Sequence, residues 1–128
     1  VAALGELLID FTQNGLSGEG NWLMEANPGG APPNVLAMLK KLGHSVSFIG
    51  KVGDDIFGKH LKNVLDDLGI GTENLIVDTE FNTTLAFVQT KQDGDRDFSF
   101  YRNPGADTQL ASHEINLQIF EKTKIIRK

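Results

Sequence analysis

The sequence predicts an α/β protein built around a parallel β-sheet with helices packed on it. Segments that suit buried strands alternate with segments whose apolar residues recur every three or four positions, in the order strand, helix, strand, helix, strand. This alternation is typical of parallel sheets with right-handed crossover connections. The 128 residues, of which 40% are hydrophobic, can bury a sizeable core and fit one domain or a part of one.

The first predicted strand covers residues 4–9, a nearly continuous apolar run of the kind found in strands that are buried on both faces. Asp10 follows directly, and open α/β sheets bind ligands at the carboxyl ends of such strands. Residues 11–20 are rich in Gly, Asn and Ser and predict a loop. Residues 21–26 predict a short exposed strand.

A glycine-rich segment, residues 27–34, leads into the first predicted helix. The apolar residues of this helix have helical spacing, and Gly43 is placed to end it. They are Val35, Met38, Leu39 and Leu42. Residues 45–52 then predict the second strand of the parallel sheet.

The second predicted helix follows the sequence Gly-Asp-Asp at residues 53–55. Asp54 or Asp55 would cap its first turn and complement its dipole, and Gly69 ends it. Its apolar face consists of Phe57, Leu61, Val64, Leu65 and Leu68. Residues 75–77 predict a third, short strand.

An antiparallel hairpin interrupts the parallel pattern. Residues 84–91 and 96–102 are two β-prone runs, separated by a turn signal at Asp93-Gly94. Phe98 and Phe100 share one face of the second run, so we expect that face to be buried against another part of the protein. Residues 112–120 predict a helix, and residues 124–126 predict the start of another strand.

Composition excludes several classes of function. The 12 basic and 17 acidic residues give a net charge of −5, which argues against a phosphate-binding face for nucleic acid. The longest apolar run is too short to span a bilayer, so we expect no membrane partner. The chain has no cysteine and therefore no disulfide or thiolate zinc site, which fits a cytoplasmic protein.

The familiar motifs for binding nucleotides or metals are absent. Neither the GxxxxGK[ST] loop nor the GxGxxG loop occurs, and the three histidines form no HExxH pattern. We therefore expect no metal ligands in this chain, and interpret the histidines as surface or packing residues.

What remains is a polar cluster around the first predicted strand and helix. It consists of Asp10, the pair Gly29 and Gly30, and Asn34. A carboxylate and a carboxamide beside bare glycine backbone suit the neutral hydroxyl groups of a sugar, because glycine lets a ring approach the main chain. Each residue also has a simpler interpretation, as a turn or helix-start residue, which we favour for any one of them taken alone.

Two motifs at a fixed spacing are more specific. Residues 29–34 (Gly-Gly-Ala-Pro-Pro-Asn) and residues 50–58 (Gly-Lys-Val-Gly-Asp-Asp-Ile-Phe-Gly) together resemble the N-terminal signature of the ribokinase-like (PfkB) carbohydrate kinases. Residues 4–10, 82–88 and 100–107 are similar to the fructokinase branch of that family. The resemblance extends over the whole chain.

The resemblance implies a ribokinase-like fold with helices on both faces of a central sheet and a small β lid over the sugar. The lid hairpin would be residues 84–102, with residues 21–26 as a further lid strand, and the lid would mediate a homodimer. In such kinases the equivalents of Asp10, Gly29, Gly30 and Asn34 hold sugar hydroxyls. Phe100 and Arg102 of the second lid strand would be further sugar contacts.

The family's second signature is missing from this sequence. That Gly-Ala-Gly-Asp segment carries the catalytic base and an anion hole, so we expect residues 1–128 to be the N-terminal part of one kinase domain with no catalytic residue of its own. The start at Val1 and the end within a strand-like run also suggest a fragment, which alone would be inactive. The resemblance implies ATP and Mg²⁺, with K⁺ as a further candidate ion, bound mainly by the missing half.

Three functions remain open at this point. The first is a fructokinase, which transfers the γ-phosphate of ATP to a hydroxyl of fructose. The second is a kinase for another substrate, such as 2-keto-3-deoxygluconate, although a sugar acid would call for more basic residues near the lid. The third is a non-catalytic α/β binding domain, in which the long hairpin of residues 84–102 would be unusual.

Overall fold

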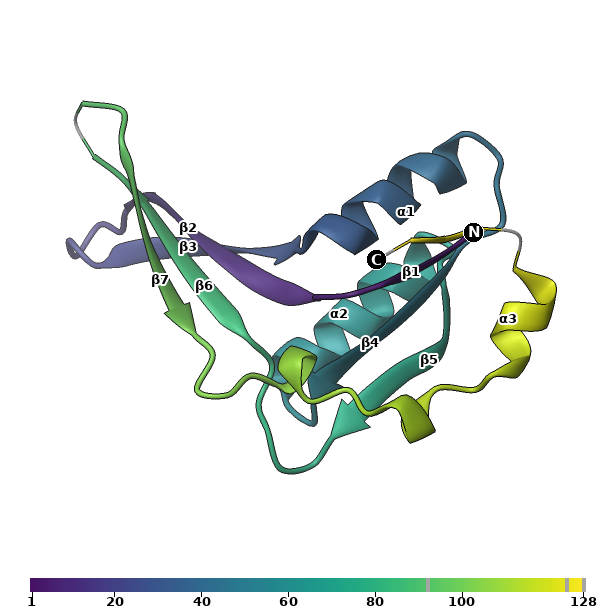
Figure 1. Cartoon of the computed structure of the whole chain (residues 1–128). Helices are drawn as coiled ribbons and strands as arrows, with labels where there is room; N and C mark the ends of the chain where they lie inside the picture. The colour runs from purple at the N-terminus through teal and green to yellow at the C-terminus, as the bar shows by residue number, and fades with distance from the viewer. Residues whose placement is uncertain (92, 124, 128) are drawn as a thin grey trace.

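The computed structural model describes residues 1–91, 93–123 and 125–127. It contains two sheets, one carrying the helices and one projecting away from them (Figure 1). In chain order the elements are β1 (Ala2–Leu4), β2 (Leu8–Leu16), β3 (Trp22–Gly29), α1 (Ala31–Lys41), β4 (Ser47–Gly53), α2 (Ile56–Asp67), β5 (Gly71–Asp78), β6 (Leu85–Thr90), β7 (Arg96–Tyr101), 3₁₀ turns at Ala106–Thr108 and Ser112–Glu114, α3 (Gln118–Lys122) and β8 (Ile126–Arg127).

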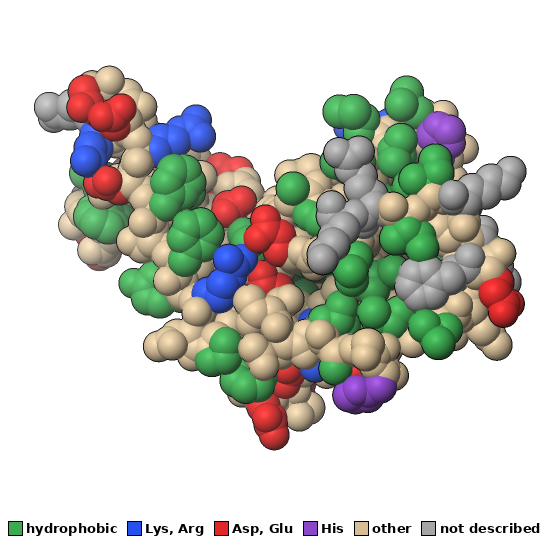
Figure 2. Space-filling model, viewed as in Figure 1, with side chains coloured by type: hydrophobic (Ala, Val, Ile, Leu, Met, Phe, Trp, Pro, Cys, Tyr) green, Lys and Arg blue, Asp and Glu red, His purple; other side chains and the backbone are tan. Residues whose placement is uncertain are grey.

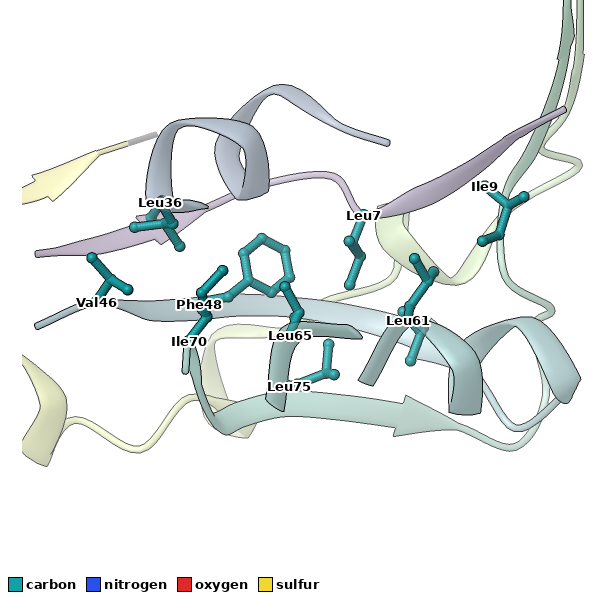
Figure 3. Packing of buried hydrophobic residues seen from close by; sticks show 11 residues of the cluster. Leu7, Ile9, Leu36, Val46, Phe48, Leu61, Leu65, Ile70 and Leu75 are labelled. Atoms are coloured by element: carbon teal, nitrogen blue, oxygen red, sulfur yellow. The ribbon is translucent and has the colours of Figure 1, made fainter. Parts of the chain in front are cut away.

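The first sheet is parallel throughout, in the order β5-β4-β1-β8. Its core lies against α1 and α2, and Figure 3 shows Phe48 of β4 between Leu36 of α1 and Leu65 of α2. These three side chains are at most 2% exposed. The segment that follows β7 runs across β4, and Lys51 of β4 contacts it. The predicted parallel α/β arrangement is therefore confirmed.

The second sheet has the order β3-β2-β6-β7. Strand β2 runs antiparallel to β3 and parallel to β6, and β6 and β7 form the predicted antiparallel hairpin. We call these four strands the lid sheet, because they contain the predicted lid hairpin and the predicted exposed strand, which extends further than expected as β3. The lid sheet projects from the body in Figure 1.

The single strand predicted for residues 4–9 is wrong, because the chain leaves one sheet and enters the other within it. Gly5 has a φ of +155°, and its N–H donates to the carbonyl of Ile49 at 3.2 Å. The run therefore divides into β1 of the parallel sheet and β2 of the lid sheet. The loop predicted for residues 11–20 is also wrong in its first part, because pairing with β3 continues β2 to Leu16.

Both predicted helices form. Gly43 and Gly69 follow them with φ of +90° and +74°, the left-handed conformation that ends helices. Asp55, not Asp54, caps α2, since its side chain accepts a hydrogen bond from the N–H of Gly58 at 2.8 Å. The third predicted strand is longer than expected, as β5.

Two expectations in the last third of the chain are wrong. Phe98 and Phe100 are 55% and 57% exposed, so their face of the hairpin is not buried against another part of this chain. Residues 112–120 form no single helix, because the N–H of Asn116 donates to Asn74 Oδ1 at 2.8 Å and separates a 3₁₀ turn from the short α3. Of the strand predicted at residues 124–126, Lys124 lies outside the described residues, and β8 begins at Ile126.

None of the helices in the described part of the chain is both long enough and apolar enough to cross a membrane.

Candidate functional site

The predicted site residues lie where the lid sheet joins the body. The surface is hollowed between the two, and Figure 2 shows acidic side chains and Lys or Arg side chains gathered there. The site draws on β2, the end of β3, the start of α1 and the segment that follows β7. These elements come together because the chain crosses several times between the two sheets.

Asp10 lies within β2 of the lid sheet and not, as predicted, directly after a strand of the parallel sheet. Its cross-strand partners are Asn27 on β3 and Ala86 on β6, and Ala86 in turn pairs with Phe100 on β7. Directly paired residues project from the same face of a sheet. Asp10 and Phe100 therefore share one face of the lid sheet, as the sequence-based site requires.

The carboxylate of Asp10 is half-buried. Burial raises its pKa above the ordinary value of 3.8, and the nearby charge of Glu6 raises it further. Asn27 fixes the strand pair beside it, since its side-chain amide donates to the carbonyl of Asp10 at 3.3 Å and to Thr12 Oγ1 at 3.2 Å. Asp10 is thus an acceptor held in place, in surroundings less polar than water.

Gly29 and Gly30 are required by close contacts. A Cβ atom on Gly29 would overlap Asp10 Oδ2, although the backbone of Gly29 has no left-handed φ. Gly30 has a φ of +117°, and a Cβ there would strike the carbonyl oxygen of Glu6. Gly30 is the N-cap of α1 and supplies no capping side chain. Asn34 is exposed one turn further on, close to Gly30 on the helix surface.

Arg102 is held by two carboxylates. Its Nη2 donates to Glu6 Oε2 at 3.1 Å and to Asp107 Oδ2 at 2.9 Å. The guanidinium also lies 5.6 Å from the centre of the Phe100 ring, which is stacked on Phe98 with 6.4 Å between ring centres. The Arg102 side chain is 30% exposed. Arg102 and Phe100 are therefore brought together, with part of the guanidinium open to solvent.

The predicted set did not include two residues, Glu6 and Asp107. Asp107 is buried, with its side chain 2% exposed, and it also accepts a hydrogen bond from Thr84 Oγ1 at 2.5 Å. Glu6 is exposed at the crossing from β1 to β2. A charged residue that interrupts an apolar run, as Glu6 does, is the one signal in the sequence that could have identified it.

A hydrogen-bonded cluster around Asp55 anchors the crossing from β5 to β6. Asp55 accepts hydrogen bonds from the N–H and the hydroxyl of Thr83, both at 2.8 Å, in addition to the bond from Gly58. Burial works to raise the pKa of Asp55, but these hydrogen bonds outweigh it and hold the pKa below 3.8. The start of α2 is thereby tied to the base of the lid sheet.

A buried ion cluster on the other face of the parallel sheet surrounds Lys51. Lys51 Nζ lies 2.8 Å from Glu114 Oε1 and 3.4 Å from Asp78 Oδ2, and it donates to the carbonyl of Gln109 at 3.2 Å. The hydrogen bond to Glu114 raises the pKa of Lys51 against the opposing effect of burial. This cluster holds the segment after β7, which also carries Asp107 of the site.

Within residues 1–91, 93–123 and 125–127, no three His, Asp or Glu side chains form a group that could hold a metal ion. Two of the carboxylates near the site, those of Glu6 and Asp107, are engaged by Arg102.

The two sheets, one carrying the helices and one projecting beside a polar hollow, define an α/β protein with a second, lid-like sheet. The crystal structure of fructokinase from Xylella fastidiosa has the same fold, with a TM-score of 0.92 at 33% identity, over 98% of this chain and 39% of that one. The structure of fructokinase with bound ATP from the same organism gives 0.91 at 32% identity, over 98% of this chain and 40% of that one.

The chain belongs to the pfkB family of carbohydrate kinases, whose family model matches residues 1–128. It is 46% identical over 128 residues to "Probable fructokinase-5" of Arabidopsis thaliana and 44% identical over 128 residues to "Fructokinase-2" of Oryza sativa subsp. japonica. These comparisons cover 98% of this chain but 39% and 38% of the relatives. The predicted family and its ribokinase-like fold are confirmed, and the chain spans about 39% of the first relative's length.

Proposed function

We propose that this chain is the sugar-binding, N-terminal part of an ATP-dependent fructokinase. The complete enzyme would transfer the γ-phosphate of ATP to a hydroxyl of fructose. The observation that carries the proposal is the Asp10 carboxylate lying against the bare backbone of Gly29, on the lid face that also presents Phe100. The fructokinases among its relatives, at 44% identity and above for the first two, support the same substrate.

The contribution of this chain to the reaction is to bind and orient the sugar. The Asp10 carboxylate accepts hydrogen bonds from sugar hydroxyls, and Gly29, Gly30 and Asn34 complete the polar wall. Phe98 and Phe100 offer exposed rings to the apolar face of the sugar. Phosphoryl transfer leaves little covalent work to the protein, so fixing one hydroxyl in line with the phosphate is a large part of catalysis.

The charge of the site favours a neutral sugar over a sugar acid such as 2-keto-3-deoxygluconate. The Arg102 guanidinium lies over the Phe100 ring, and both Glu6 and Asp107 already bind it. Asp10 adds a further carboxylate without a cationic partner in the described part of the chain. An anionic substrate would therefore meet an excess of negative charge.

The catalytic base would come from the rest of the protein, since we assign no catalytic residue to this chain. ATP is the proposed phosphate donor, and the similarity to a fructokinase solved with bound ATP supports it. Mg²⁺, and K⁺ as a further candidate, belong to the same proposal. Because the described residues do not form a metal site, we assign both ions to the remainder of the enzyme and no step here to either.

We further propose a cytoplasmic homodimer that associates through the lid sheet. The lid face opposite Phe100 carries a groove of about 430 Å³ whose lining includes Trp22, Met24, Phe87 and Tyr101. Trp22 and Tyr101 are 64% and 63% exposed, and aromatic side chains are typical of protein interfaces. Trp22→Glu should convert a dimer to a monomer in sedimentation equilibrium; a wild type that is already monomeric would refute this assembly. Fractionation of the source cells tests the proposed cytoplasmic location.

A coupled assay of ADP release over a panel of sugars tests the proposed activity in the full-length protein. We expect fructose to give the highest kcat/KM. A higher value for ribose, for 2-keto-3-deoxygluconate or for a nucleoside would refute the fructokinase assignment. If no substrate in the panel causes ADP release, the kinase assignment is refuted and a binding protein is favoured.

A further inference from the structure

A bulge near the tip of the lid sheet contains Asn14 and Gly15. The pairing of β2 with β3 shifts register between Gln13 and Leu16, so that two residues of β2 lie opposite one residue of β3. Such a β-bulge leaves its extra residue out of the ladder of strand hydrogen bonds. Gly15 has a φ of +79°, and a Cβ atom there would meet nothing within 4 Å. The bulge therefore lies in an open part of the hairpin, at the end of β2 and β3 that points away from the body in Figure 1.

The side chain of Asn14 is exposed and loosely held. Its Nδ2 donates to Glu25 Oε2 at 3.5 Å, which is longer than the range of about 2.7–3.2 Å for a well-formed N–H···O hydrogen bond. Glu25 is paired with Thr12, which shares the lid face of Asp10, since alternate residues of a strand project from the same face. This face is opposite the groove proposed for dimerisation, so a dimer of that kind leaves the Asn14 side chain accessible.

An asparagine that precedes glycine can lose its side-chain amide without an enzyme. The backbone nitrogen of the glycine gives up its proton and attacks the side-chain carbonyl carbon, and the amide group takes up a proton and leaves as ammonia. The product is a succinimide ring, which water opens to aspartate or to isoaspartate. Glycine favours the attack because no side chain shields its nitrogen and its backbone rotates freely. Asn14 is the only asparagine in the sequence that precedes glycine.

We propose that Asn14 is a site of spontaneous deamidation in the folded protein. Ring closure requires the Gly15 nitrogen to approach Asn14 Cγ, a backbone rotation that regular strand pairing resists and the bulge permits. The reaction replaces the hydrogen-bond donor to Glu25 by a second negative charge, and isoaspartate adds a methylene group to the main chain. The modification thus loosens the tip of the lid sheet. It is independent of the proposed function, since it depends on the hairpin alone.

Peptide mapping by mass spectrometry tests this in the full-length protein after prolonged incubation at neutral pH. The readout is the fraction of each asparagine-containing peptide in which NH₂ has been replaced by OH. Asn63 is the matched control, since it is also exposed but lies in α2 and precedes Val64. Val64→Gly gives Asn63 the same following residue within a hydrogen-bonded helix, which separates the effect of the bulge from that of the dipeptide. Circular dichroism checks that each sample stays folded.

We expect several-fold more conversion at Asn14 than at Asn63 in the wild type, with both aspartate and isoaspartate among the products. In Val64→Gly, Asn63 should still react more slowly than Asn14. Equal conversion of the two asparagines in the wild type would overturn the proposal. Conversion of Asn63 in folded Val64→Gly as fast as that of Asn14 would overturn the role given to the bulge. If Val64→Gly does not fold, the comparison within the wild type still decides.

Discussion

The carboxylate of Asp10 lies directly against the backbone of Gly29, with no room between them for a Cβ atom. The two residues belong to paired strands, β2 and β3, where Gly29 lies opposite Leu8. Because Gly29 has no left-handed φ, the requirement for glycine there is steric and not conformational. The position of the carboxylate in the hollow thus depends on the absence of one methyl group.

Gly29→Ala should displace the Asp10 carboxylate and weaken sugar use. A misplacement of about 1 Å in a binding group can cost about a hundredfold in rate, and we expect a loss of that order in kcat/KM for fructose. Gly18→Ala is the control, because a Cβ on Gly18 meets nothing within 4 Å. Equal kinetics for the two variants would argue that Asp10 does not bind the sugar.

Lys51→Met should destabilise the protein, because it leaves Asp78 and Glu114 without their cation. The Lys51 and Asp78 side chains are only 10% and 9% exposed, and removing one partner of a buried ion pair costs about 3–5 kcal/mol. Lys62→Met, which breaks an exposed pair with Asp66, should cost about 1 kcal/mol or less. Urea denaturation of both variants measures the difference, and similar midpoints would show that the cluster contributes little.

The same cluster predicts how stability depends on pH. The hydrogen bond from Lys51 holds the pKa of Glu114 below its ordinary 4.5, so Glu114 stabilises the fold above that value and loses this effect as pH falls through its folded pKa. The pKa of Lys51 is raised above 10.5, so its contribution is complete below that pH and is lost as pH rises through the raised value. The Tm of the wild type should decrease as the pH drops below about 4.5, and this decrease should be smaller in Lys51→Met. Parallel curves of Tm against pH for the wild type and Lys51→Met would contradict the proposed effect of Lys51 on Glu114.

Asp55→Ala should loosen the attachment of the lid sheet to α2. The variant loses the cap of α2 and both hydrogen bonds to Thr83, and we expect a cost of about 2–4 kcal/mol in the free energy of unfolding. Asp54→Ala is a close control, since Asp54 is the exposed neighbour and does not cap the helix. Hydrogen exchange of the amides in β6 should accelerate in Asp55→Ala alone. Unchanged exchange there would mean that Asp55 only caps the helix.

Local patterns predicted the first two helices and the hairpin well, because periodicity, caps and turn residues act over a few neighbouring positions. The apolar run at residues 4–9 was misread, since apolarity does not reveal that Gly5 passes the chain from one sheet to another. Phe98 and Phe100 look like core residues by the alternation of β7, but no segment of the described chain covers them.

The site was predicted from residue types and a family resemblance, and the structure places Asp10, Gly29 and Gly30 together as expected. It also places Arg102 next to Phe100. Glu6 and Asp107 were missed because they meet through Arg102, 96 and 5 residues away along the chain. A contact of that kind has no signature in local sequence.

Asp10→Ala in the full-length protein tests the central claim most directly, through separate measurements of the dissociation constants for fructose and for ATP by calorimetry. Hydrogen bonds to a charged group contribute about 1.5–3 kcal/mol each. We therefore expect the affinity for fructose to fall about tenfold or more and the affinity for ATP to stay unchanged. Circular dichroism should show the fold retained. Undiminished fructose affinity in a folded Asp10→Ala variant would contradict the claim that this chain carries the sugar-binding site.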